Sequence, residues 1–142
     1  MEWRELIVDG YGRVLQILEK ALDGLTQDDL NQRPHLDCNS MGWLTWHLTR
    51  VQDDHIADLM GEEQLWLGDG WHARFNRPPE PKDIGFGHSS EDVVVFRSPD
   101  VATLLEYHRA VLERSKRYIT TLSTSDLVLK QPGHHSPLQC PG

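Results

Sequence analysis

The chain has 142 residues, of which 38% are hydrophobic, and its formal net charge at pH 7 is −8. This length and composition predict one domain with a single core. The acidic balance, with no basic cluster longer than residues 114–117, disfavours a nucleic-acid partner, and no apolar run approaches the ~18 residues of a membrane span. Because no signal region follows Met1, and Cys38 and Cys140 form no CxxC pair, we expect a cytoplasmic protein with reduced thiols.

Residues 5–25 are predicted to form the first long helix. Their apolar positions recur at helical spacing: Ile7, Tyr11, Val14, Leu15, Leu18, Leu22 and Leu25. Thr26 is followed three residues later by Asp29, which predicts a capped short turn that ends before Pro34.

Residues 39–59, NSMGWLTWHLTRVQDDHIADL, form the most strongly patterned segment and predict a second long helix capped by Asn39 or Ser40. Three- to four-residue spacing predicts one apolar face, made of Leu44, Leu48, Val51, His55 and Leu59. His47 is expected on that face, packed among Leu44, Leu48 and Val51. Judged by spacing alone, such a histidine is more often a core residue with one hydrogen bond than a metal ligand.

Residues 62–97 are rich in prolines and glycines but also contain the aromatics Trp66, Trp71, Phe75 and Phe86. Disordered segments are poor in aromatics, so we expect an ordered crossover that lies over the mouth of a bundle. GWHARF predicts one or two helical turns. SSEDVVVF fits either a helix capped by Ser89 or Ser90 or a short strand, because periodicity cannot separate the two.

Ser98 and Pro99 predict the start of a third long helix of about six turns, with Ser98 as N-cap. Its end, LSTSDL, echoes LTQDDL after the first helix, which suggests two similar helix pairs. The second pair would need a partner helix from about residue 135. The segment VLKQPGHHSPLQCPG is rich in proline and glycine and does not predict one. We therefore divide the chain into a helical domain, 1–127, and an irregular C-terminal tail, 128–142.

The run WLTWHLTRVQDDH, from Trp43 to His55, resembles the second helix of the DinB-like superfamily of helical bundles. The resemblance extends from about Val8 to about Leu127. It is closest to an actinobacterial subfamily of unknown function related to mycothiol-dependent maleylpyruvate isomerase. It implies an all-α, up-down bundle with a long crossover and three long helices, and the tail leaves the fourth helix incomplete or absent.

In the wider family the second helix supplies one histidine of a three-ligand divalent metal site, and His47 matches it. A later helix supplies the other two ligands as a His-x-x-x-His, Glu-x-x-x-His or Asp-x-x-x-His pair, which this sequence does not show. The resemblance implies a metal-dependent thiol transferase or isomerase with a low-molecular-weight thiol as co-substrate. We expect zinc or nickel to be absent or weakly bound here. The alternative is a non-catalytic helical protein that binds a partner or a small molecule.

Several other residues are candidates for a pocket beside His47, and each also has an ordinary structural interpretation. Trp43 and Trp46 are expected in the core or at its rim, His55 in the core, and Asp53 and Asp54 in solvent or paired with Arg50. His134, His135 and Cys140 could bind zinc or nickel adventitiously. The uncovered groove predicts a homodimer, unless the tail folds over it. The pocket candidates are Trp43, Asp54, His55, His72, His88 and His108.

Overall fold

The computed structural model describes residues 2–35 and 38–128, and within them it holds helices and no strand. The helices are α1 (Trp3–Leu22), α2 (Gln27–Asn31), α3 (Met41–Met60), α4 (Leu65–Gly68), α5 (Trp71–Arg74), α6 (Ser90–Val95), α7 (Val101–Thr121) and the 3₁₀ helix η1 (Thr124–Val128). The predicted all-α class is confirmed. SSEDVVVF is the helix α6, so the strand alternative is wrong.

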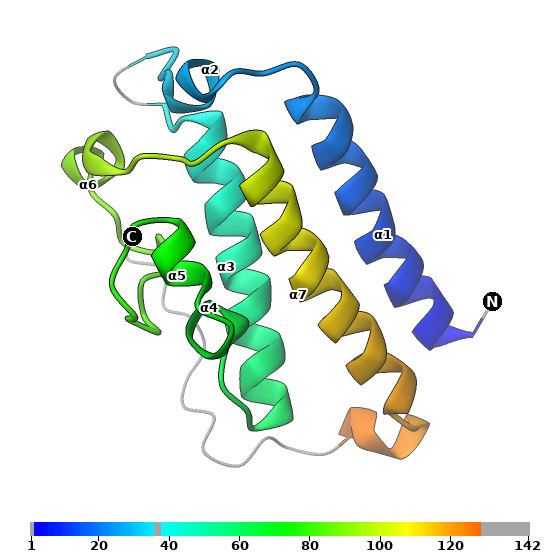
Figure 1. Ribbon diagram of the computed structural model, residues 1–142. Coiled ribbons are helices and arrows are strands. Elements are labelled where there is room, and N and C mark those ends of the chain that lie inside the picture. Colours follow the sequence, from blue (N-terminus) through cyan, green and yellow to red (C-terminus); the bar gives the residue numbers. More distant parts are fainter. Residues whose placement is uncertain (1, 36–37, 129–142) are drawn as a thin grey trace.

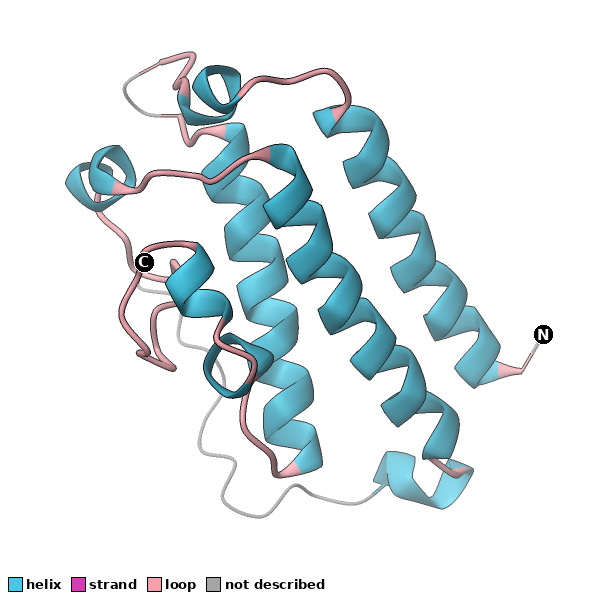
Figure 2. Ribbon diagram, in the orientation of Figure 1, coloured by secondary structure: helices cyan, strands magenta, loops and turns pink. Residues whose placement is uncertain are grey.

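The three long helices lie side by side, with α7 packed against both α1 and α3 (Figures 1 and 2). α1 runs opposite to α3 and α7, and the connection between α3 and α7 carries the chain back along the bundle through α4, α5 and α6. The predicted bundle of three long helices with a long crossover is therefore present. The predicted loss of a fourth helix falls on residues 129–142, which lie outside the described residues.

Local side-chain caps define several helix starts. Thr26 and Asp29 form the predicted capping box of α2, and Ser40 accepts the backbone N–H of Trp43 at the start of α3. The predicted start of α7 is wrong by two residues. Asp100, not Ser98, is the N-cap, because its carboxylate accepts the Thr103 N–H at 2.9 Å.

Ser98 instead joins α7 to the N-terminal half of the chain. Its N–H donates to Asn31 Oδ1 at 2.7 Å, and its carbonyl accepts from the side-chain amides of Asn31 and Gln27. Gly42 of α3 completes this joint, because a Cβ there would lie 2.3 Å from the Ser98 Cβ. The joint fixes where α7 begins relative to α2 and α3.

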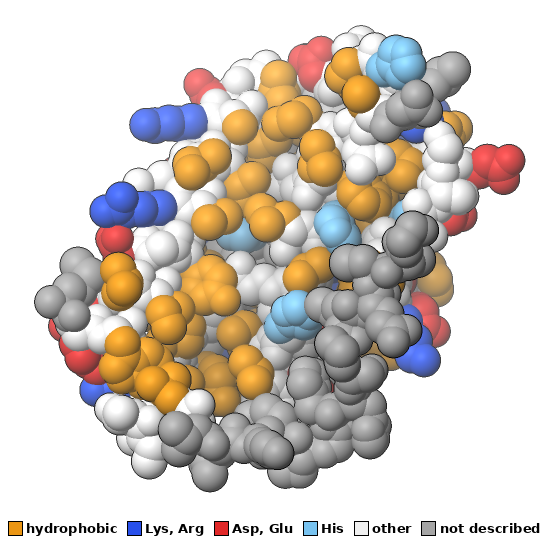
Figure 3. All heavy atoms as spheres, turned by 180° about the vertical axis from the view of Figure 1, so that it is seen from behind, with side chains coloured by type: hydrophobic (Ala, Val, Ile, Leu, Met, Phe, Trp, Pro, Cys, Tyr) orange, Lys and Arg blue, Asp and Glu red, His pale blue; other side chains and the backbone are white. Residues whose placement is uncertain are grey.

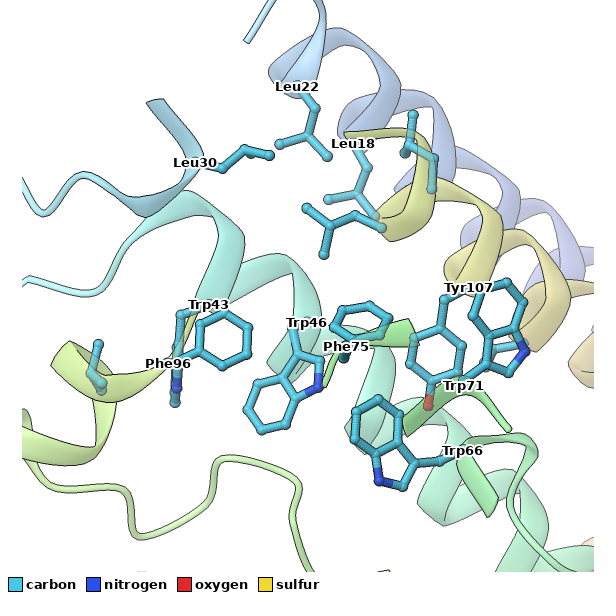
Figure 4. Packing of buried hydrophobic residues seen from close by; sticks show 14 residues of the cluster. Leu18, Leu22, Leu30, Trp43, Trp46, Trp66, Trp71, Phe75, Phe96 and Tyr107 are labelled. Carbon is cyan, nitrogen blue, oxygen red and sulfur yellow. The ribbon is translucent and has the colours of Figure 1, made fainter. Parts of the chain in front are cut away.

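Aromatic side chains from the crossover fill the centre of the core (Figure 4). Trp66, Trp71 and Phe75 all lie within 5.7 Å of the Tyr107 ring, centroid to centroid, and Trp66 also lies against Trp46. The predicted packed crossover is confirmed, although Phe86 stays half exposed. Trp43 and Trp46 are buried, as predicted.

The predicted inner face of α3 is wrong. Leu44, Leu48 and Leu59 are 45%, 40% and 40% exposed, and His55 is exposed as well. At about 100° per residue, these positions lie roughly opposite the side that meets the crossover. Besides Gly42, Ile56 and Ala57, the buried side carries aromatic and polar residues: Trp43, Thr45, Trp46, Thr49, Arg50, Gln52 and Asp53.

Candidate functional site

His47 lies between the buried and the exposed side of α3 and is half buried, where the crossover passes over the helix. Its ring stacks on Trp43 with centroids 4.8 Å apart, and its Nδ1 lies 2.5 Å from the carbonyl oxygen of Ile84. The predicted contacts with the exposed leucines of α3 are therefore replaced by contacts with Trp43 and the crossover backbone. The expected single hydrogen bond is present.

Gly85 makes this close approach feasible. Its φ is +90°, and a Cβ there would lie 2.7 Å from His47 Nδ1 and 3.0 to 3.1 Å from the rings of Trp43 and Trp46. A side chain would fill the space that the imidazole and indoles occupy, and the positive φ also favours glycine.

The bond to Ile84 determines the tautomer of His47. A carbonyl oxygen only accepts, so Nδ1 carries the proton, and in the neutral ring Nε2 is left with its lone pair. Fixing one ring nitrogen to a carbonyl is how proteins commonly orient a histidine that acts through the other nitrogen. In the neutral His47 ring, the lone pair that could bind a metal ion or a proton therefore lies on Nε2.

Arg50, one turn further along α3, holds the segment that carries Ile84. Its guanidinium is 0% exposed and donates to the carbonyls of Pro81 and Asp83 at 3.1 and 2.9 Å, while stacking over Trp66 at 4.5 Å. These bonds attach the crossover backbone to α3 immediately before the carbonyl that receives His47. Arg50 is thus a positioning residue for the His47 site.

Asp53 balances the buried charge of Arg50. Its carboxylate is 1% exposed and lies 3.6 Å from Arg50, which confirms the predicted pairing, but the predicted solvent exposure is wrong for Asp53. The same carboxylate accepts the backbone N–H groups of Leu65 and Trp66 at 3.0 and 2.9 Å and the Tyr107 hydroxyl at 2.7 Å. Burial, together with the Asp53 charge, raises the pKa of Tyr107 well above its usual value, so the phenol stays protonated and donates.

His88 adjoins the same aromatic cluster from the crossover side. Trp43 donates its indole N–H to His88 Nδ1 at 3.2 Å, and the His88 ring stacks on Trp46 with centroids 5.8 Å apart. His88 Nε2 faces Asp83 at 3.6 Å, and Arg77 binds the same carboxylate at 2.6 and 2.9 Å. His88 and His47 therefore contact the same Trp43 ring.

The other pocket candidates make their contacts elsewhere. His72 Nδ1 lies 3.1 Å from the Arg77 carbonyl, Asp54 accepts from Gln64 at 2.9 Å, and His55 is exposed on the open side of α3. His108 is 0% exposed on the inner side of α7, with Nδ1 2.8 Å from the Thr49 hydroxyl. Burial lowers the pKa of His108 to about 4, which keeps the ring neutral.

Within residues 2–35 and 38–128, no three histidine, cysteine, aspartate or glutamate side chains lie close enough together to hold a metal ion. His134, His135 and Cys140, the predicted adventitious ligands, lie outside the described residues. Nor is any helix in the described part of the chain long and apolar enough to cross a membrane.

Sequence reasoning missed the residues that position His47. Ile84 acts through its backbone, which no sequence pattern reports, and Gly85 stood only as one of several glycines in the crossover. Arg50 gave a weak signal. An arginine three residues before Asp53 predicted an ion pair, but nothing in the pattern placed that pair inside the protein.

Comparisons with known proteins agree with the all-helical fold. The fold matches a crystal structure of a conserved protein from Enterococcus faecalis with a TM-score of 0.80 and 25% sequence identity, over 88% of this chain and 74% of that chain. A search of curated proteins found no match. The model of the DinB superfamily matches residues 11–141, which extends past Leu127 into the tail. The chain therefore belongs to the DinB superfamily.

Proposed function

We propose that this chain is a thiol transferase or isomerase scaffold of the DinB type in which His47 is the metal-facing residue. The observation that carries the proposal is the bond from His47 Nδ1 to the Ile84 carbonyl, which in the neutral ring leaves the lone pair on Nε2. Arg50 and Gly85 support the same arrangement from the crossover. Membership in the superfamily supports the reaction class.

The donor set fits a divalent ion only in part. An imidazole with a fixed tautomer suits zinc or nickel, but a lone imidazole holds either ion weakly, and the described residues form no group of three ligands that could hold the ion. In a complete site the ion would lower the pKa of a bound low-molecular-weight thiol. We therefore expect the isolated chain to bind metal weakly and to turn over no substrate.

The second candidate function is a non-catalytic helical protein that binds a partner or a small molecule. Two observations favour it: the missing three-residue metal cluster within the described residues and the exposed apolar side of α3. In this alternative His47 serves only to attach the crossover to α3.

Nickel and zinc binding distinguishes these functions. Isothermal titration is carried out on a His134→Ala/His135→Ala background, so that the tail histidines do not contribute. We expect weak binding that His47→Ala reduces by about tenfold or more, while the matched control His55→Ala, on the same helix, changes it little. Equal binding by all variants would leave His47 a structural residue and favour the second function.

A thiol-transfer assay tests the reaction class directly. Mycothiol or glutathione is supplied with chlorodinitrobenzene, with and without added nickel or zinc, and we expect no metal-dependent rate. Stoichiometric metal in the purified protein, lost in His47→Ala together with metal-dependent turnover, would show that the site is complete and that our expectation of inactivity is wrong.

A further inference from the structure

One hydrogen bond holds the imidazole of His47 to the Ile84 carbonyl, but a single bond does not fix the plane of a ring. Stacking does so: the His47 and Trp43 rings lie 4.8 Å apart, centroid to centroid, with 20° between their planes. His47 is half buried, and on the rear of the molecule histidine side chains lie at the surface among hydrophobic ones (Figure 3). The direction in which the Nε2 lone pair points therefore depends on how the Trp43 indole is held.

The crossover holds the Trp43 indole through two contacts. The indole N–H donates to His88 Nδ1 at 3.2 Å, and Gly85 packs so closely that a Cβ there would lie 3.0 Å from the indole ring. An indole N–H only donates, so His88 Nδ1 accepts, and in the neutral His88 ring the proton lies on Nε2. His47 carries its proton on Nδ1, so the two histidines that contact Trp43 have opposite tautomers.

His88 is itself held on several sides. Its ring stacks on Trp46 with centroids 5.8 Å apart and 25° between the planes, and its Nε2 faces Asp83 at 3.6 Å. Arg77 binds both carboxylate oxygens of Asp83, at 2.6 and 2.9 Å, and its guanidinium lies over Trp46 at 4.9 Å. The side chains of His88 and Asp83 are only 16% and 10% exposed. This enclosure gives the His88 ring one orientation.

We infer that His88 is a positioning residue of the His47 site and acts through Trp43. His88 Nδ1 fixes the indole of Trp43, and the indole fixes the plane of the His47 ring. The orientation of His47 is a property of the metal-free protein. Its consequence rests on the proposed function, because the direction of Nε2 matters only where Nε2 binds a metal ion.

The ordinary alternative is that His88 only attaches the crossover to α3. Arg50 already attaches the same segment, since its guanidinium donates to the carbonyls of Pro81 and Asp83 at 3.1 and 2.9 Å. The segment should therefore stay on α3 when His88 is replaced. What the replacement should change is the hold on the Trp43 indole.

Two substitutions isolate the acceptor at His88. Asparagine and leucine have the same branched shape, and both lack a group that reaches as far as Nε2. The side-chain oxygen of asparagine lies two bonds from Cβ, as Nδ1 of histidine does, so His88→Asn can still accept the Trp43 N–H. His88→Leu cannot. The two variants thus differ in the bond to Trp43 and not in the lost contact with Asp83.

NMR of the metal-free, full-length protein gives the readout. The ring current of an indole shifts the protons of a ring stacked on it to high field, and the exposed His55 on the same helix serves as the unstacked reference. We expect His47 to show this shift in the wild type and in His88→Asn, and to lose about half of it or more in His88→Leu. Ser89→Ala, which removes the neighbouring cap of α6, should keep the shift.

A second route tests the same bond from its donor. Trp43→Phe keeps a ring under His47 but removes the N–H, so His88→Leu should have no further effect on the His47 ring in that background. Circular dichroism melts show that each variant is folded. An unchanged His47 shift in His88→Leu would overturn the inference. Equal losses in His88→Asn and His88→Leu would also overturn it, because the acceptor would then have no effect.

Nickel titration on the His134→Ala/His135→Ala background adds a functional readout. His88 acts on His47 through one intervening ring, so we expect His88→Leu to weaken the His47-dependent binding by about fivefold and His88→Asn by less than about twofold. If nickel binding did not depend on His47 at all, the proposed function would fail. The NMR pattern of the metal-free protein would still decide whether His88 positions the His47 ring.

Discussion

In an ordinary amphipathic helix the leucines face the core and the charged residues face solvent, whereas in α3 the leucines are exposed and charged residues are buried. The side toward the crossover and α7 is buried, yet it carries Arg50, Asp53 and Thr49. The opposite side holds leucines that are about 40% exposed. The spacing of aliphatic residues shows on which side of a helix they lie, but not which side is buried. In α3 the neighbouring elements are held mainly by hydrogen bonds and aromatic rings on the side opposite the leucines.

Removing Asp53 should produce the largest loss of stability. Asp53→Ala leaves the buried Arg50 charge without a counterion and strips three donors of their acceptor, so we expect a loss of about 3 to 5 kcal/mol in urea unfolding. The control is Asp9→Ala, which removes the exposed pair with Arg13 and should cost about 0.5 kcal/mol or less. Similar losses for the two would mean that the buried side of α3 is not held by its charges.

His108 should make the α3–α7 contact sensitive to acid. Its pKa in the folded state, about 4, lies below the ordinary value of about 6.5, so between these values the unfolded chain binds a proton that the folded chain does not. The contribution of the neutral His108 ring to the free energy of unfolding is complete above pH ~6.5. It falls by up to about 3 kcal/mol as the pH drops from there through the folded-state pKa.

Urea midpoints between pH 7 and 4 test this dependence. His108→Leu should flatten the curve by that amount, whereas His55→Gln, which removes an exposed histidine, should keep most of the fall. Parallel curves for wild type and His108→Leu would assign the acid sensitivity to other groups.

A side chain at Gly85 should displace the crossover from His47. Gly85→Ala adds a methyl group 2.7 Å from His47 Nδ1 in a backbone of positive φ, and we expect a loss of about 2 kcal/mol. Gly87→Ala is matched for φ, at +78°, but its Cβ would meet nothing within 4 Å. Only Gly85→Ala should change the ¹⁵N shifts of the His47 ring in NMR. Equal effects of the two changes would rule out the contact with His47.

The Tyr107 hydroxyl should have the smallest effect of the four. Tyr107→Phe removes one of the donors to Asp53 but leaves the ring packing intact, so we expect a loss of about 1 kcal/mol. Tyr118→Phe, whose hydroxyl makes a longer and more exposed bond at 3.3 Å, should lose less. The comparison is made by thermal unfolding at pH 7.

The sequence predicted those features that depend on local rules. The capping residues Thr26 and Ser40, the long helices and the packed crossover follow from turn chemistry, periodicity and composition. His47 makes the one hydrogen bond that was expected of it. The buried side of α3 was missed because leucines count for more than Arg50 and Asp53 in a hydrophobic pattern. The partners of these two charged residues lie far away in sequence, at residues 65–83 and 107. The start of α7 was misplaced because Ser98 bonds to a residue far away in sequence.

The joint at Ser98 makes the starting position of α7 independent of the length of the crossover that leads into it. Its hydrogen bonds to Asn31 and Gln27 span 67 and 71 residues, so α7 takes its starting position from α2 and not from the connection that leads into it. Closing a longer flexible loop costs little, about 0.6 kcal/mol for each doubling of its length. Insertions at the exposed residues 78–80, ahead of the carbonyls that Arg50 binds, should therefore be tolerated without shifting α7. The crossover can vary in length there while the three long helices keep their register.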